Sequence, residues 1–209
     1  MSAAEHTPDK LMEAGVSGIV MAGGESRRMG RDKSSLILGG MTLLERQIAL
    51  MVGLGIDDIL VSGRQTDHPA ARYVPDIMSG KGPLEGLYTC FKQAQYENCL
   101  VTCVDMPLLP AAVLKQLIQQ HLLEETDVTL LSHRGRTEPL LGVYRSSLWE
   151  KAGCLLAEGK SAVRALIGAV RIGTREFTGP EELLINCNTE EDYIRAITWF
   201  DSKAVSLLV

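Results

Sequence analysis

A glycine-rich, cationic segment between residues 17 and 34 carries the side chains of this sequence that are best suited to chemistry. The segment reads SGIVMAGGESRRMGRDKS, and its apolar, strand-like start ends at Gly23 and Gly24. Because glycine has no Cβ atom, the backbone there can turn sharply and lie against a ligand. Four cations follow within seven residues, namely Arg27, Arg28, Arg31 and Lys33. Backbone N–H groups and fixed positive charge together bind phosphate oxygens, so the segment predicts a triphosphate site. A glycine turn followed by a solvated basic loop is the alternative.

The same segment excludes two common nucleotide-binding signatures. A P-loop would read GxxxxGK[ST], whereas the run here ends in GRDKS. No GxGxxG is present either, so the dinucleotide-binding fingerprint is not met. The predicted phosphate site is therefore of another kind.

A carboxylate after a later strand is the best candidate for holding a metal ion. Alternation along that strand places Val101, Cys103 and Asp105 on one face, so the carboxylate emerges just beyond an apolar element. The following pair Met106-Pro107 favours an extended exit. A carboxylate held there can bind Mg²⁺, whose other positions are filled by phosphate oxygens and water. An Asp that caps the next turn is the alternative.

A sheet must position these residues, and the alternation of strand-like and helix-like segments predicts one that is mostly parallel, with helices on both faces. Strands are expected at 18–22, 58–62, 72–74, 98–104, 127–132 and 139–144, with a late edge strand at 169–172. Helices are expected from the capping box Thr42–Glu45 to Gly53, at 83–93, from Pro110, at 148–158, at 162–167, and after Thr189, where Asp192 completes a second capping box. The predicted fold class is α/β, in a single domain. Ligands of such sheets bind beyond the carboxyl ends of the strands.

Length and composition limit the class of protein. A chain of 209 residues with 45% hydrophobic content suits one globular domain, which we place at 17–209 after a flexible extension at 1–16. The net charge of −5 argues against binding to a nucleic-acid polymer. No apolar run approaches the roughly 20 residues of a membrane span, and the N-terminal region lacks the pattern of a signal peptide. No membrane association is expected.

The cysteines indicate a reducing compartment. There are five, an odd number without a CxxC pair, so we expect free thiols and a cytoplasmic protein. Cys99 and Cys103 would lie about 13 Å apart on one strand. That separation is too large for a disulfide or a shared metal ion, so both are expected in the core.

The opening motif resembles that of a known family. The run MAGG at 21–24, followed by SRRMGRDK at 26–33, is similar to the LAGGxSxRMGxDK signature of the molybdenum cofactor guanylyltransferases, with Met21 in place of leucine. The resemblance extends from about residue 18 to residue 193. It implies a nucleotidyltransferase with a Rossmann-like fold that joins GMP from GTP to the phosphate of Mo-molybdopterin. The products would be a guanine dinucleotide cofactor and pyrophosphate, and the implied cofactor is Mg²⁺.

The resemblance also assigns roles residue by residue. Lys33 would stabilise charge on the phosphates, with Arg28 as a weaker candidate, and Asp105 would be the catalytic carboxylate and the metal ligand. The residues expected to bind the nucleotide are Met21, Ala22, Gly23, Gly24, Lys33, Ser62, Asp76, Gly82 and Asp105. Ser62 stands where the family often has Asn, so it keeps a hydroxyl but loses the paired donor and acceptor of an amide.

A late polar segment is expected to bind the acceptor. Asn186 and Asn188 belong to a run that resembles the family's NxNTPEE ending, with Glu190 in place of proline. Capping of the following helix by these side chains is the alternative reading of the same run. The basic turn at 134–139 would lie either near the acceptor phosphate or in solvent.

Two other functions remain open at this stage. Cytidylyl transfer to molybdopterin, or nucleotidyl transfer to another small phosphate acceptor, would use the same fold. A nucleotide-binding module without turnover belongs to a different class, and the presence of both Lys33 and Asp105 argues against it. Transient contact with proteins of molybdenum cofactor biosynthesis, or with acceptor proteins, is a further expectation.

Overall fold

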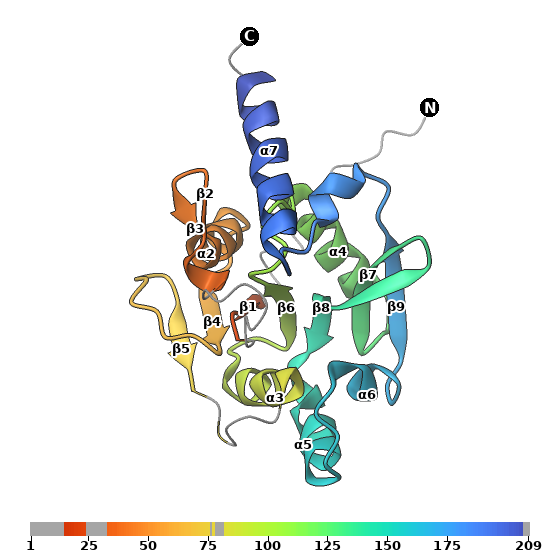
Figure 1. The fold of residues 1–209 in the computed structure, drawn as a ribbon. Coiled ribbons are helices and arrows are strands. Elements are labelled where there is room, and N and C mark those ends of the chain that lie inside the picture. The colour runs from red at the N-terminus through yellow and green to blue at the C-terminus, as the bar shows by residue number, and fades with distance from the viewer. Residues whose placement is uncertain (1–14, 24–32, 76, 78–81, 207–209) are drawn as a thin grey trace, which may run out of the picture.

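A seven-stranded sheet forms the centre of the fold (Figure 1). The computed structural model describes residues 15–23, 33–75, 77 and 82–206. The strands of the sheet are β1 (Val16–Met21), β4 (Asp58–Ser62), β5 (Arg72–Val74), β6 (Asn98–Cys103), β7 (Val128–His133), β8 (Arg136–Arg145) and β9 (Ile172–Glu176). Their order is β5-β4-β1-β6-β8-β7-β9. β8 is antiparallel to β6 and β7, and the other pairings are parallel. The carboxyl ends of all the strands except β8 therefore meet at one edge of the sheet.

Helices cover both faces of this sheet. They are α2 (Leu43–Gly53), α3 (Pro83–Gln93), α4 (Ala111–Leu123), α5 (Trp149–Ala157), α6 (Val163–Ile167) and α7 (Glu190–Ser206), with 3₁₀ helices at Lys33–Ser35, Ser146–Leu148 and Glu181–Leu184. α2 and α4 lie on one face and α3, α5 and α6 on the other, while α7 extends away from the sheet (Figure 1). The predicted fold class is confirmed. None of the helices in the described ranges is long and apolar enough to cross a bilayer.

Local sequence explains where the main elements begin. The strands β1 and β4 have no exposed residue, which is why they read as nearly continuous apolar runs. The hydroxyl of Thr42 accepts from the N–H of Glu45 at 3.1 Å, and the Glu45 carboxylate accepts from the N–H of Thr42 at 2.8 Å. Thr189 and Asp192 form the same reciprocal pair at the start of α7. Both predicted capping boxes are confirmed, and they fix the start of α2 and of α7.

A small hairpin precedes α2 and was not among the predicted elements. Its strands are β2 (Ile37–Leu38) and β3 (Met41–Thr42). The two glycines between them, Gly39 and Gly40, have φ angles of 61° and 83°. Two successive residues with positive φ form the tight turn that matches the twist of paired strands. The Gly-Gly pair was the sequence signal for this hairpin.

Several predicted boundaries shift near the C-terminal half of the sheet. The expected edge strand at 169–172 is wrong, because the N–H of Ala169 donates to the carbonyl of Leu166 in the turn that ends α6. The edge strand is β9, which is partly exposed along its length and carries polar residues beyond Ile172. β8 starts at Arg136, so the predicted basic turn is reduced to Arg134 and Gly135. At the other end of the chain, β1 begins one residue before the predicted domain start, and residues 1–14 of the predicted extension lie outside the described part.

Candidate active site

Backbone hydrogen bonds hold three strand ends together at the carboxyl edge of the sheet. The N–H of Ala22, just after β1, donates to the carbonyl of Ser62 at the end of β4, at 2.9 Å. The N–H of Val104, just after β6, donates to the carbonyl of Met21 at 3.2 Å. The segments that follow β1, β4 and β6 therefore leave the sheet side by side, which is where open α/β sheets bind their ligands.

A lysine, a carboxylate and an amide meet at this edge. Nζ of Lys33 lies 3.2 Å from Oδ2 of Asp105 and 2.7 Å from Oδ1 of Asn188. The three residues come from the 3₁₀ helix that begins at the end of the opening motif, from the turn after β6 and from the segment before α7. The side chains of Lys33 and Asp105 are 14% and 28% exposed, so the ion pair is half-buried but open to solvent. The structure thus brings together residues that lie 72 and 155 positions apart in the sequence.

Two further contacts hold the turn that carries Asp105. The carbonyl of Asp105 accepts from the N–H of Cys187 at 2.8 Å, which fixes the Asn186–Asn188 segment against it. Nε2 of Gln47, buried on α2, donates to the carbonyl of Met106 at 3.1 Å. Sequence reasoning missed Gln47, although a polar side chain on the apolar face that includes Leu44 and Ile48 was an available signal. Because both bonds go to backbone carbonyls, they position the turn without occupying the carboxylate.

Close glycine contacts let the surrounding chain approach the strand ends. Gly63 has a φ of +82°, and a Cβ atom on it would come within 3.0 Å of the backbone of Gly23. Gly86, in the first turn of α3, packs so closely that a Cβ there would come within 3.0 Å of Ser62 and Met21. Both positions require glycine for steric reasons. Without a Cβ atom there, α3 and the segment after β4 can pack against the end of β1.

The predicted nucleotide-binding residues fall into three groups. The side chains of Met21, Ala22 and Ser62 are buried, so a ligand at the rim would meet the backbone of this segment more readily than its side chains. Gly23 and Gly82 are exposed, and Gly82 precedes α3 with a φ of +81°. The remaining predicted site residues, Gly24, Arg28 and Asp76, lie outside the described residues, as do Arg27 and Arg31. Of the predicted cationic loop, the structure thus places Lys33.

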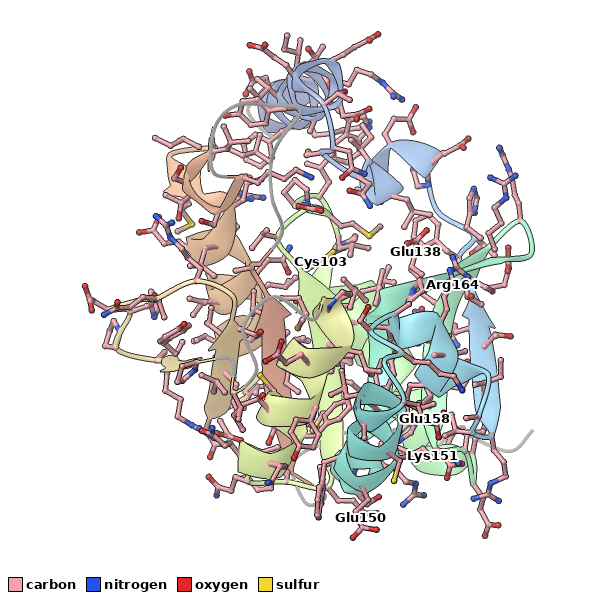
Figure 2. All side chains as sticks on the ribbon, turned by 60° about the horizontal axis from the view of Figure 1, so that its bottom comes forward. Cys103, Glu138, Glu150, Lys151, Glu158 and Arg164 are labelled. Atoms are coloured by element: carbon pink, nitrogen blue, oxygen red, sulfur yellow. The ribbon has the colours of Figure 1, made fainter. Side chains whose placement is uncertain are left out.

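A cavity of about 430 Å³ opens beside Asp105. The side chains around it that bear on its chemistry are Cys103, Asp105, Glu138, Arg164 and Asn186. Oδ1 of Asn186 is buried and has no hydrogen-bond partner among the described residues. Figure 2 labels Cys103, Glu138 and Arg164, which lie around the opening between the end of β6, β8 and α6. Asp105 therefore belongs both to the lining of this cavity and to the cluster with Lys33 and Asn188.

The cysteines near the cluster are held in the thiol form. Burial is the main factor that raises the pKa of Cys103 to about 12, and the negative charge of Asp105 adds to it. Burial, followed by the charge of Asp105, likewise raises the pKa of Cys187 to about 12. All five cysteines are free, and Cys99 and Cys103 are buried as predicted. Because a thiol is a poor nucleophile compared with a thiolate, neither Cys103 nor Cys187 is suited to covalent catalysis.

The basic turn between β7 and β8 does not join this cluster. The guanidinium of Arg134 forms an ion pair with Glu181 at 3.0 Å, and its backbone N–H donates to Glu176 at 2.7 Å. Both side chains of the ion pair are largely exposed. A solvated position therefore fits Arg134, whereas Glu138 and Pro139 of the predicted 134–139 segment line the cavity beside Asp105.

The fold is that of the nucleotidyltransferases. A nucleotidyl transferase from Methanothermobacter thermautotroptrophicus superposes on this chain with a TM-score of 0.74 at 21% sequence identity, and the match covers 90% of this chain and 98% of that one. At this level of identity, the likeness concerns the fold alone.

Sequence comparison defines the family more narrowly. Residues 18–173 match the MobA-like NTP transferase domain, so the chain belongs to that family. A probable molybdenum cofactor guanylyltransferase from Carboxydothermus hydrogenoformans is 33% identical over 193 residues, which is 88% of this chain and 96% of that protein. A protein of the same description from Mycolicibacterium paratuberculosis is 38% identical over 193 residues, covering 87% and 94% of the two chains. The resemblance seen in the opening motif is confirmed.

The contact between Gly63 and Gly23 predicts a steric limit that can be measured. We expect Gly63→Ala to lower the free energy of unfolding by at least about 2 kcal/mol, because alanine would combine an unfavourable positive φ with a clash against backbone. Gly53→Ala is the matched control, since a Cβ there meets no atom within 4 Å. Urea unfolding of both variants checks this. Equal stabilities of the two variants would contradict the packing of β4 against the end of β1.

Proposed function

We propose that this protein transfers GMP from GTP to the phosphate of Mo-molybdopterin, with release of pyrophosphate. The observation that carries the proposal is the half-buried contact of Lys33 with Asp105 at 3.2 Å and with Asn188 at 2.7 Å. The family relationship supports it, because two relatives that match most of this chain are described as probable molybdenum cofactor guanylyltransferases. GTP and molybdopterin are the substrates that this description implies.

The proposed reaction needs positive charge more than it needs a nucleophilic side chain. Its nucleophile is already a phosphate anion, so no serine or cysteine has to be activated. The main barrier is the repulsion between two groups of anions that must meet in line. The ammonium of Lys33 stands at the strand ends where both would arrive, and it would stabilise charge on the α-phosphate and on departing pyrophosphate. The protonated thiols of Cys103 and Cys187 are consistent with a reaction that makes no covalent enzyme intermediate.

The site also fits a magnesium ion that is held largely by its substrates. No cluster of three or more His, Cys, Asp or Glu side chains suited to a metal ion occurs within the described ranges. Asp105 offers a partly exposed carboxylate next to Lys33, and no described residue donates to its Oδ1. Mg²⁺ is commonly bound by one or two carboxylates together with phosphates and water. We therefore propose Asp105 as the protein's ligand for Mg²⁺, which when bound would neutralise charge on the phosphates.

The two substrates would approach Asp105 from opposite sides. The backbone of Ala22 and Gly23 lies at the end of β1, next to β4, and is the described part of the proposed nucleotide side. Asn186 and Asn188 lie on the proposed acceptor side, against the turn of Asp105. Roles for Gly24, Arg28 and Asp76 remain predictions. We also propose a cytoplasmic location, on the ground that all five cysteines are free thiols.

Nucleotide choice tests the proposed function. The enzyme is incubated with Mo-molybdopterin and Mg²⁺ and with GTP, CTP, ATP or UTP in turn, and pyrophosphate release is followed. We expect release with GTP to exceed release with each of the others by at least tenfold. A preference for CTP would make the protein a cytidylyltransferase. Binding of GTP without pyrophosphate release in the presence of the acceptor would instead indicate a module without turnover.

Removal of the charge on Asp105 tests the proposed site. We expect Asp105→Asn to lower kcat/KM at least a hundredfold, about 2.7 kcal/mol of barrier, because the ligand of Mg²⁺ and the partner of Lys33 are lost together. Asp201→Asn, on the exposed surface of α7, is the control and should match the wild type. A rate for Asp105→Asn within threefold of wild type, about 0.7 kcal/mol, would rule this role out.

A further inference from the structure

The cavity beside Asp105 contains two charged side chains that the proposed reaction leaves without a role. Glu138 comes from β8 and Arg164 from α6, and both line the cavity. Figure 2 shows them close to each other at the opening between β8 and α6. Within the described ranges, no hydrogen bond or ion pair engages the carboxylate of Glu138 or the guanidinium of Arg164. Both groups are exposed and available to a ligand.

The wall that carries Arg164 is part of the folded core and is not a loose surface segment. Val163 and Leu166, its neighbours on α6, are buried. The carbonyl of Ser161, just before α6, accepts from the N–H of Leu84 at 3.2 Å, which ties this wall to the start of α3. The position of Arg164 relative to the sheet edge is therefore set by packing, so a ligand would meet a preformed surface.

The lining of the cavity connects this pair with Asp105. Asp105, Glu138 and Arg164 all line the same cavity, together with Cys103 at the end of β6. The buried, unpartnered Oδ1 of Asn186 lines the same cavity. A ligand with its phosphate at Asp105 would have its remaining part next to Glu138 and Arg164.

Glu138 and Arg164 together match one kind of ring edge. A carboxylate accepts two hydrogen bonds from neighbouring N–H groups, and a guanidinium donates two to neighbouring acceptors. Along one edge, a 2-amino-4-oxopyrimidine ring carries an amino group, a ring N–H and a carbonyl oxygen, in that order. Guanine and pterin both contain this ring edge. Either substrate of the proposed reaction could therefore be recognised by this pair on chemical grounds.

The sheet order favours the pterin. β6, which ends next to Asp105, lies between β1 and β8 in the sheet. The proposed nucleotide side is formed by the exits of β1 and β4, whereas Glu138 belongs to β8 on the other side of β6. A guanine base that belongs to a nucleotide bound at the exits of β1 and β4 would have to pass Asp105 to enter this cavity. The acceptor approaches from the side on which the cavity already lies.

We propose that Glu138 accepts hydrogen bonds from the 2-amino group and ring N–H of the acceptor pterin, and that Arg164 donates to its 4-oxo oxygen. This inference rests on the proposed function, because it assigns the specificity for the acceptor at the same site. It assigns no role to these side chains in binding GTP.

Matched substitutions on the same face of the molecule test the two residues. Glu138→Gln and Arg164→Gln remove the charges, and Glu150→Gln and Lys151→Gln are controls on α5, which Figure 2 shows away from the cavity. We expect each cavity variant to raise the KM for Mo-molybdopterin at least tenfold while the KM for GTP changes less than twofold. Because all four side chains are exposed, the variants should fold, and equal urea midpoints verify this.

Substrate analogues test the assigned hydrogen bonds directly. A pterin monophosphate and its 2-oxo analogue, a lumazine, are compared as competitive inhibitors against Mo-molybdopterin. We expect the wild type to favour the pterin at least tenfold and Glu138→Gln to reduce this preference below threefold. The preference for GTP over inosine triphosphate, which lacks the 2-amino group, should be the same in Glu138→Gln as in the wild type.

Three results would overturn the inference, and each is distinct. Cavity variants that behave like the α5 controls would show that the pair does not bind the acceptor. Loss of the preference for GTP over inosine triphosphate in Glu138→Gln would place guanine in the cavity instead. Wild-type enzyme that transfers no GMP to Mo-molybdopterin would refute the proposed function, and the inference would fail with it.

Discussion

The contact between Lys33 and Asp105 is the interaction on which the arrangement of this site depends. It joins the end of the opening motif to the turn after β6, and Asn188 adds the segment before α7. A half-buried ion pair contributes little to stability, because desolvation offsets much of the attraction between its charges. The unusual feature is its place at the carboxyl edge of a mostly parallel sheet, where apolar residues would serve packing better. A lysine and a carboxylate kept at this edge are explained by phosphate and metal binding more readily than by folding.

The surrounding structure constrains this contact mainly through backbone atoms. The exits of β1, β4 and β6 are joined by N–H to carbonyl bonds, and the carbonyls of Asp105 and Met106 accept from Cys187 and from the side chain of Gln47. Gly63 and Gly86 allow neighbouring segments to approach the strand ends to within contact distance. These supports use backbone carbonyls and not the Asp105 carboxylate or the Lys33 ammonium. Both charged groups therefore remain close to solvent. A site of this kind is preorganised for charge and open to two anionic substrates.

The sequence predicted the elements that follow simple local rules. The strands β4 and β5, the helix that begins at Pro83 and both capping boxes are all confirmed, because each depends on residues close together in the chain. The edge strand β9 could not be located by apolar residues, since its pairing with β7 is decided by tertiary contacts. The segment 134–139 was singled out for its basic residues, but neither Glu138 nor Arg164 could be assigned to a cavity, because nothing in the nearby sequence indicates that β8 and α6 meet there. Gly24, Arg28 and Asp76 were identified through the family motif, and they lie outside the described residues.

The central claim is that Lys33 and Asp105 act as one unit on the phosphates. A double-mutant cycle measures this most directly, with kcat/KM for GMP transfer determined for Lys33→Met, Asp105→Asn and the double variant. The account predicts strong non-additivity, in which the double variant loses about as much activity as the more damaged single variant, because either change already dismantles the unit. Free-energy losses that add to within about 0.5 kcal/mol would mean that the two residues act independently, and would contradict the account.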